Sequence, residues 1–283
     1  MAETETRDDD DDQQQDVFFL INQVPIHFAE DWNTGIGGGL WSTGLAFAKY
    51  LKHRSEDVIV NLHRLASMKK CYSSDDSAKL NGISALELGS GNGFLSACLL
   101  ALVVSHGNNI PLTELVITDM RDHLSLIFTT LNTNSHVWDT ITYEDGENIT
   151  LDGRLSSTTV DKEIQHQRQT QQSPHVILAE HVWGKFESPK SNRNNHIYNK
   201  KYDFIFGTDL AYRNSLHDPL ISSLLNFSHQ HTLCLIGVTM TDTQPIFFAR
   251  LTDAGFRYEK LADNLLQREY RGGNFGLIAI QRR

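Results

Sequence analysis

Short apolar segments alternate along the chain with longer segments in which apolar residues recur every three or four positions. The first kind predicts buried strands, and the second predicts amphipathic helices. Because the two kinds alternate, the pattern predicts a mostly parallel α/β sheet with helices on both faces. The predicted strands are residues 17–21, 25–28, 84–88, 115–118, 176–179, 204–207, 232–238, 256–261 and 275–281. The predicted helices are residues 40–54, the apolar run after residue 93, residues 121–134, a helix beginning near residue 215, and residues 245–254.

Three polar stretches lie outside this pattern. Residues 1–16 contain eight acidic residues and one arginine, so they carry −7 of the formal net charge of −10. Such a segment buries no apolar surface, and we expect a disordered acidic tail that is solvated or steers a basic partner. The stretches near 139–174 and 187–200 are predicted to be flexible insertions. Residues 17–283 are predicted to form one domain.

The composition excludes several classes of protein. Apolar residues make up 40% of the chain, enough for a sizeable core, yet no apolar stretch approaches the roughly 18 residues of a membrane span. The N-terminus lacks the pattern of a signal peptide and the three cysteines form no CxxC pair, so we expect a reduced, cytoplasmic protein. No basic stripe is present to neutralise nucleic-acid phosphates. His229 and His231 have no second pair of ligands at metal-binding spacing, so we expect no metal site.

The stretch Glu87-Leu-Gly-Ser-Gly-Asn-Gly93 joins a predicted strand to the helix that follows it. Glycine lets the backbone turn tightly and approach a ligand closely, and the free N–H groups of the helix N-terminus favour an anionic group. The dinucleotide pattern G-x-G-x-x-G/A has its third small residue one position later, where this chain has Phe94. The spacing therefore favours S-adenosylmethionine (SAM) over NAD or FAD.

This turn resembles motif I of the seven-strand, SAM-dependent methyltransferases. Four other segments are similar, in order, to those of methyltransferase family 16: Gly35-Ile-Gly-Gly-Gly-Leu-Trp41-Ser-Thr-Gly44, Leu115-Val-Ile-Thr-Asp119, Val182-Trp183-Gly184 and Thr208-Asp209-Leu-Ala-Tyr212. The chain departs from the family at Val182, where an acidic residue usually stands. The resemblance extends from about Val17 to the C-terminus. It implies a Rossmann-like, seven-stranded class I fold, SAM as cofactor, and a relation to protein-lysine methyltransferases that act on chaperones and translation factors.

Several residues are candidates for holding the cofactor. Asp119 ends an apolar strand, where a carboxylate can accept both ribose hydroxyls, although it could instead cap the next helix. Glu87 lies inside an apolar strand and either orders the loop or touches the cofactor. Trp183 either stacks on adenine, which contributes on the order of 1–3 kcal/mol, or packs in the core. By resemblance Trp41 covers the methionine end, with core packing as its alternative. The resemblance also places Gly89, Ser90, Gly91 and Thr208 in the cofactor site.

Asp209 and Tyr212 follow a predicted strand at the carboxyl edge of the sheet, where open α/β folds bind ligands. Methyl transfer is an in-line displacement, so the protein mainly has to position a neutral amine. We expect Asp209 to accept a hydrogen bond from a lysine amine and Tyr212 to wall the lysine channel. The alternative for Asp209 is a cap on the helix near Ser215. Enzymes that methylate base amines typically have two prolines between these residues, whereas this chain has Leu210 and Ala211.

The sequence therefore predicts a SAM-dependent protein-lysine N-methyltransferase, cytoplasmic and monomeric, with no nucleic-acid, membrane or metal partner. One alternative is a methyltransferase for another protein nucleophile or a small amine. Another is a non-catalytic SAM-fold protein that binds a chaperone-like partner. Transfer of a labelled methyl group to a protein would support the enzyme, and cofactor binding without transfer would support the binding protein.

Overall fold

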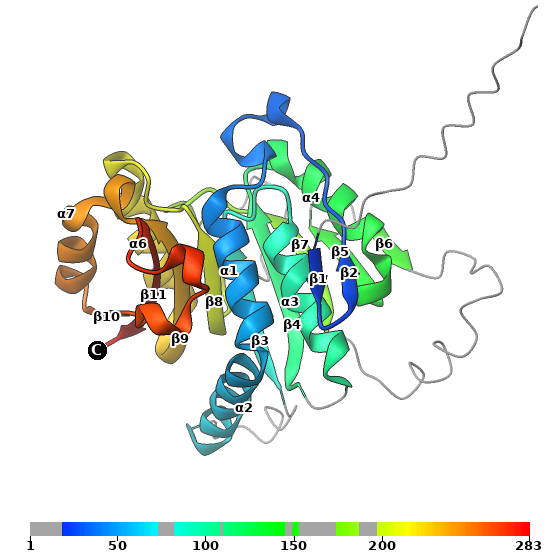
Figure 1. The fold of residues 1–283 in the computed structure, drawn as a ribbon, viewed down its shortest axis with the longest axis horizontal. Coiled ribbons are helices and arrows are strands. Elements are labelled where there is room, and N and C mark those ends of the chain that lie inside the picture. Colours follow the sequence, from blue (N-terminus) through cyan, green and yellow to red (C-terminus); the bar gives the residue numbers. More distant parts are fainter. Residues whose placement is uncertain (1–18, 73–81, 108–109, 145–148, 153–173, 187–196) are drawn as a thin grey trace, which may run out of the picture.

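A nine-stranded sheet runs through the centre of the protein, and helices cover both of its faces (Figure 1). The computed structural model describes residues 19–72, 82–107, 110–144, 149–152, 174–186 and 197–283. All of the expected acidic tail and most of both expected insertions lie outside these residues. A separate two-stranded sheet is formed by β1 (Phe19–Ile21) and β2 (Val24–Ile26).

Seven strands of the large sheet follow the predicted α/β pattern, in the order β10-β11-β9-β8-β3-β4-β7. Five of them run parallel, and the β10–β11 hairpin joins β9 antiparallel. Their bounds are β3 (Ile83–Leu88), β4 (Leu112–Asp119), β7 (His175–Glu180), β8 (Tyr202–Thr208), β9 (Ser228–Thr239), β10 (Phe256–Lys260) and β11 (Phe275–Arg282). The predicted mostly parallel α/β fold is confirmed. Because the five parallel strands share one direction, the loops after their carboxyl ends meet at one edge of the sheet.

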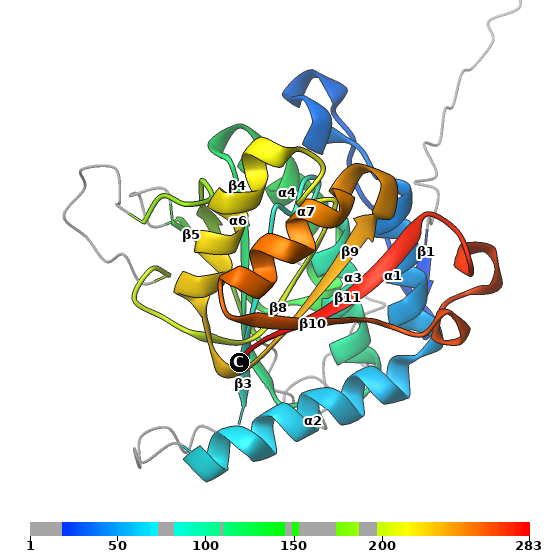
Figure 2. The same ribbon diagram turned by 90° about the vertical axis from the view of Figure 1, so that its left-hand side faces the viewer.

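The helices form one layer on each face of the sheet, and Figure 2 shows α6 and α7 on one side with α1 on the other. Each layer buries its own apolar cluster, one including residues of α1 to α4 and the other residues of α6 and α7. The bounds are α1 (Ser42–His53), α2 (Ser55–Tyr72), α3 (Phe94–Ser105), α4 (Arg121–Thr133), α6 (Asn214–Phe227) and α7 (Met240–Asp253). Short 3₁₀ helices are η1 (Trp32–Thr34), η2 (Ile36–Gly38), η5 (Ser135–Val137), η6 (Asp263–Leu265) and η7 (Arg268–Tyr270). None of the helices in the described ranges has the length and apolarity of a membrane span.

Helix α3 is apolar on all sides, which is typical of a helix that is buried all round. Its first residue, Phe94, is buried and meets the ring of Phe19 edge to face, with 5.8 Å between the ring centroids. Phe28 contacts the same ring from the segment after β2. The apolar residue after the glycine-rich turn therefore packs the N-terminal hairpin against α3.

Two elements differ from the predicted pattern. Helix α2 covers residues for which we predicted no element. Its buried face is marked by Val58, Leu62 and Leu65, but most of its other residues are polar, so its apolar periodicity is weak. The start of the expected insertion 139–174 forms β5 (Thr140–Glu144), parallel to β7, and β6 (Ile149–Asp152), antiparallel to β5.

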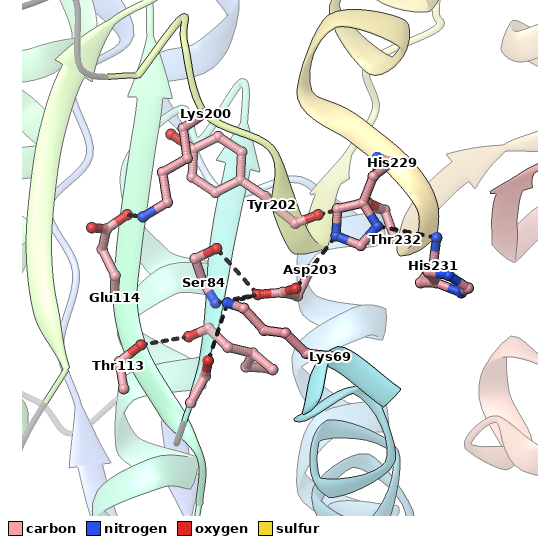
Figure 3. Close-up of polar contacts among 12 residues, drawn as sticks. Lys69, Ser84, Thr113, Glu114, Lys200, Tyr202, Asp203, His229, His231 and Thr232 are labelled. Atoms are coloured by element: carbon pink, nitrogen blue, oxygen red, sulfur yellow. Dashed lines mark hydrogen bonds and ion pairs between the residues drawn. The ribbon is translucent and has the colours of Figure 1, made fainter. Parts of the chain in front are cut away.

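A buried carboxylate joins the amino ends of β3 and β8 to helix α2 (Figure 3). Asp203 accepts hydrogen bonds from Lys69 Nζ (2.9 Å) and from the backbone N–H of Ser84 (2.8 Å), and His229 Nε2 lies 3.4 Å from its other oxygen. Burial alone would raise the pKa of Asp203, but the hydrogen bonds from His229, Lys69 and Ser84 outweigh it and hold the pKa below its usual value. This cluster lies at the opposite end of the parallel strands from the loops described below.

We expect Asp203→Ala to lower the free energy of unfolding by at least about 1–3 kcal/mol, because the buried N–H of Ser84 loses its acceptor. Since the pKa of Asp203 is lowered by folding, the stabilisation is present above the pKa of the unfolded chain and is lost as the pH falls through the folded value. Urea titrations at pH 7 and pH 3 measure both effects. Asp57→Ala, which breaks an exposed ion pair with Arg54, is the control and should change stability by less than about 1 kcal/mol. Equal effects of the two variants would contradict the structural role of Asp203.

Candidate active site

A cavity of about 600 Å³ opens at the carboxyl ends of the parallel strands. It is lined by the loops after β3, β4, β7 and β8 and by the segment that leads into α1. All ten residues that the sequence suggested for the site line this cavity: Trp41, Glu87, Gly89, Ser90, Gly91, Asp119, Trp183, Thr208, Asp209 and Tyr212. Their proximity is thus established, while the role of each stays a prediction.

The glycine-rich turn approaches two other parts of the chain so closely that side chains would collide. Gly89 and Gly91 have φ angles of +61° and +64°, in the left-handed region that favours glycine. A Cβ on Gly89 would lie 2.8 Å from Leu210 Cδ2, and a Cβ on Gly91 would lie 2.8 Å from the carbonyl oxygen of Gly37. The absence of side chains at Gly89 and Gly91 therefore lets the turn pack closely against Leu210 and Gly37. Gly93 instead packs toward Ile127 of α4 and ends the turn as the residue before α3.

Glu87 is buried on β3 and holds the glycine-rich turn in place through its carboxyl group. Its carboxylate accepts hydrogen bonds from Ser90 Oγ (2.6 Å) and from the hydroxyl of Ser96 on α3. Burial raises the pKa of Glu87 to about 7, although the two hydroxyl bonds act in the opposite direction. Of the two predicted roles, these bonds support loop ordering, and the carboxyl group also lines the cavity.

The carboxylate of Asp119 is the meeting point of three hydrogen-bond donors. Oδ2 accepts the N–H of Gly91 at 2.7 Å, and Oδ1 accepts the N–H of Met120 at 2.7 Å and faces His123 Nδ1 at 2.7 Å. The residue that caps α4 is Met120, so Asp119 is not the helix cap that was its alternative. A carboxylate has about four acceptor positions, and three are in use. Room remains for about one ribose hydroxyl, rather than the two expected from the sequence.

Trp183 and Trp41 both line the cavity. Trp183 is half-buried beside Gly89, and a Cβ on that glycine would lie 2.9 Å from its ring. Trp41 is 43% exposed and donates from its indole nitrogen to the carbonyl of Ile36 at 2.7 Å. It is therefore not a core residue, which was the alternative for it. Thr208, the last residue of β8, also lines the cavity.

Asp209 holds an unusual backbone conformation at the end of β8. Its φ of +54° lies in the left-handed region, and its N–H donates to the carbonyl of Gly237 at 2.9 Å. Thr239 Oγ1 donates to its carboxylate at 3.2 Å. Burial and, to a smaller extent, the charge of Asp242 raise the pKa of Asp209 to about 6, against the bond from Thr239. Helix α6 begins at Asn214 with Arg213 before it and without a side-chain cap, so Asp209 does not cap that helix.

Acidic side chains dominate the electrostatics of the cavity. Four carboxyl groups line it, and none of the described residues in its wall is lysine or arginine. The four are Glu87, Asp119, Asp209 and Asp242. A phosphate-bearing ligand would meet no lysine or arginine side chain in the described wall, whereas a cationic ligand would be attracted. Within the described ranges, no three His, Cys, Asp or Glu side chains form a group that could hold a metal ion.

Sequence patterns missed three parts of the site. His123 follows Asp119 by four residues, which is one helical turn, and that spacing is a signal that could have found it. The segment Ile36–Leu40 was noted only for its resemblance, although its glycines indicated a close backbone approach. Asp242 reaches the cavity from α7, and no local pattern in the sequence marks it.

The family model of the lysine methyltransferases matches residues 20–153. The resemblance to that family is confirmed. The match supports methyltransferase activity. It covers the turn at Gly89 and Asp119, whereas Asp209 and Tyr212 lie beyond it. No curated protein matches the sequence.

Several solved methyltransferase structures are similar to the chain at low sequence identity. A ribosomal protein L11 methylase from Lactobacillus delbrueckii subsp. bulgaricus is 14% identical, with a TM-score of 0.39 and 79% of each chain covered. A TehB-like SAM-dependent methyltransferase from Corynebacterium glutamicum is 9% identical, with a TM-score of 0.42, and the match covers 84% of this chain and 100% of that one. An O-methyltransferase family protein from Burkholderia thailandensis is 11% identical, with a TM-score of 0.42, covering 84% of this chain and 59% of the other.

We expect Gly91→Val to abolish SAM binding in a protein that still folds. The new side chain would displace the Gly37 carbonyl and thus the wall of the cavity, in addition to straining the backbone. Gly272→Val is the matched control, because Gly272 has a φ of +65° but no other group lies within 4 Å of the place that its Cβ would take. Calorimetry with SAM, together with circular dichroism, measures both variants. Unchanged SAM affinity in a folded Gly91→Val protein would contradict the assignment of this turn to the cofactor.

Proposed function

We propose that this protein is a SAM-dependent protein-lysine N-methyltransferase. The observation that supports it best is the position of Asp209, a half-buried carboxylate in a cavity wall without lysine or arginine among the described residues. Such a wall suits a cationic cofactor and a cationic side chain. The family match over residues 20–153 supports methyl transfer, and the name of the family supports lysine as the acceptor.

The cavity fits SAM in size and in the chemistry of its wall. Its volume of about 600 Å³ is in the range of small-molecule sites, roughly 300–1,000 Å³. Asp119 would accept a hydrogen bond from the ribose, Trp183 would contact adenine, and Trp41 would cover the methionine end. When bound, SAM supplies an electrophilic methyl group on a sulfonium sulfur. NAD fits less well, because its phosphates would face four carboxyl groups and no lysine or arginine among the described residues of the wall.

The residues at the other end of the cavity would receive the lysine. Asp209 accepts a hydrogen bond from the amine, Asp242 adds a second negative charge, and Tyr212 forms a wall of the channel. The pKa of Asp209, about 6, is well below the value of about 10.4 for a free lysine, so Asp209 is too weak a base to hold the amine proton. Its role is to orient the amine, and the proton leaves to solvent.

Two other functions remain as alternatives that experiment can separate. A methyltransferase for a histidine, an N-terminal amine or a small amine would share the cofactor site but not transfer methyl groups to lysine. A non-catalytic protein would bind SAM without transfer. Incubation with labelled SAM and cell-lysate proteins, followed by mass spectrometry of labelled bands, distinguishes these outcomes. NADH should not bind measurably. The cytoplasmic, monomeric state stays a prediction from the sequence.

We expect Asp209→Asn to leave SAM affinity nearly unchanged and to slow methyl transfer at least about tenfold, equivalent to about 1.4 kcal/mol in the barrier. The variant keeps the size of the side chain but removes the charge that faces the amine. Because the pKa of Asp209 is about 6, transfer by the wild type should also fall as the pH drops through 6, and the variant should lack this step. Transfer of labelled methyl to lysate proteins and calorimetry with SAM measure rate and affinity. A wild-type rate in the variant would remove Asp209 from the catalytic residues.

A second pair of variants tests the contribution of Asp242. Its negative charge raises the pKa of Asp209, so Asp242→Asn should move the acidic limb of the pH–rate profile to lower pH. Asp253→Asn makes the same charge change at the last residue of the same helix and should leave the profile in place. Identical profiles for all three proteins would contradict electrostatic coupling between Asp242 and Asp209.

A further inference from the structure

His123 is buried on the first turn of α4 and contacts a hydrogen-bond acceptor with each ring nitrogen. Nδ1 lies 2.7 Å from Asp119 Oδ1, and Nε2 lies 3.0 Å from the carbonyl oxygen of Thr34. The Asp119 carboxylate also accepts two backbone N–H groups, and a carbonyl can only accept. Both ring nitrogens must therefore carry a hydrogen, which describes the charged form of histidine.

The segment that His123 reaches forms one wall of the cofactor cavity. Residues 31–39 fold into η1 and η2, and the N–H of Asp31 donates to the carbonyl of Gly38 at 2.8 Å. Gly37 lies between the His123 ring and the glycine-rich turn. A Cβ there would be 2.7 Å from His123 Cε1, and a Cβ on Gly91 would be 2.8 Å from the Gly37 carbonyl. The His123 ring thus packs against residues 31–39, and these residues pack in turn against the glycine-rich turn.

We propose that the charged ring of His123 is a positioning element for cofactor binding, tying the Asp119 carboxylate to Thr34 and holding residues 31–39 closed over the cavity. The inference rests on the proposed function, because Asp119 is the residue proposed to bind the ribose. One bond fixes the carboxylate that faces the ligand, and the other fixes the wall that covers it. His123 itself does not have to touch a reacting atom.

The charge of the ring makes this link depend on pH. The hydrogen bond to Asp119 raises the pKa of His123, burial opposes this, and the charge of Asp119, the Thr34 carbonyl and Asp122 add to the rise. The charged groups facing the ring in the described structure are Asp119 from β4 and Asp122 from α4 itself; residues 31–39 face it with Thr34 and Gly37. The link is complete below pH 6.5, and it is lost as the pH rises through the raised pKa of the folded protein.

Two substitutions divide the link into its halves. In His123→Asn, the amide nitrogen replaces Nδ1 and can still donate to Asp119, but the bond to Thr34 is lost. In His123→Gln, the amide nitrogen replaces Nε2 and can still donate to Thr34, but the bond to Asp119 is lost. Both variants remove the charge. His63→Gln, at an exposed position of α2, is the control for loss of a histidine.

The test combines calorimetry with S-adenosylhomocysteine from pH 6 to pH 9 and hydrogen exchange of the ligand-free proteins. Wild type and His63→Gln should bind most tightly at pH 6 and lose affinity as the pH rises. Both His123 variants should bind roughly tenfold more weakly at pH 6, with a flatter pH dependence. Exchange at the N–H groups of Asp31 and Gly38 should be faster in His123→Asn than in His123→Gln.

Two results would overturn the proposal. Unchanged affinity, pH dependence and exchange in both His123 variants would remove the link while leaving the proposed function intact. Failure of the wild type to bind S-adenosylhomocysteine or SAM at any pH would instead contradict the proposed function, and with it the cofactor role of His123. Melting curves of all four proteins establish that the compared samples are folded.

Discussion

The Asp119 carboxylate is the constraint on which the arrangement of the site depends. It lies at the end of β4 and binds the N–H of Gly91 in the turn after β3, so it joins two neighbouring strands across the edge of the sheet. Through His123 it also reaches the segment before α1. A charged acceptor makes shorter and stronger hydrogen bonds than a neutral one, so one side chain can hold three backbone segments in register. The glycine-rich turn and the segment 31–39, which both line the cavity, therefore share this single anchor.

Close backbone approach is the second requirement of the site. Gly37 and Gly91 meet without side chains, and Leu210 fills the space that a Cβ on Gly89 would need. Leu210 is buried and follows Asp209 directly, so its packing beneath the turn also fixes where Asp209 stands. The position of the glycine-rich turn therefore depends on the position of the Asp209 loop, and the reverse also holds. Leu210 and Ala211, which stand where base-amine methyltransferases have two prolines, are both buried and so hold this loop by packing.

Local patterns in the sequence predicted the alternation of strands and helices, and together with the family resemblance they predicted ten of the residues that line the cavity. They did not predict α2, whose apolar face is diluted by polar residues, or the strands β5 and β6 at the sheet edge. The contact of Asp203 with Lys69 joins residues 134 positions apart, and no local pattern records such a pair. The hydrogen bonds of His123 depend on how the N-terminal segment folds back, which is also a property of the tertiary structure. Local patterns thus indicated the edge of the sheet that carries the cavity. They did not indicate the long-range contacts of Asp203 and His123 that hold the surrounding segments together.

Asp209 combines two unfavourable features that the fold has to offset. A non-glycine residue in the left-handed region costs on the order of 1–3 kcal/mol, and burial disfavours its charged form. The backbone bond to Gly237 and the hydroxyl of Thr239 hold it in place from β9. A carboxylate poorly solvated by its surroundings interacts strongly with a cation that reaches it. The strain and burial of Asp209 suit the cationic partner that we propose for it. Asp203 differs, because its carboxylate already has hydrogen-bond donors within the fold that hold its pKa below the usual value.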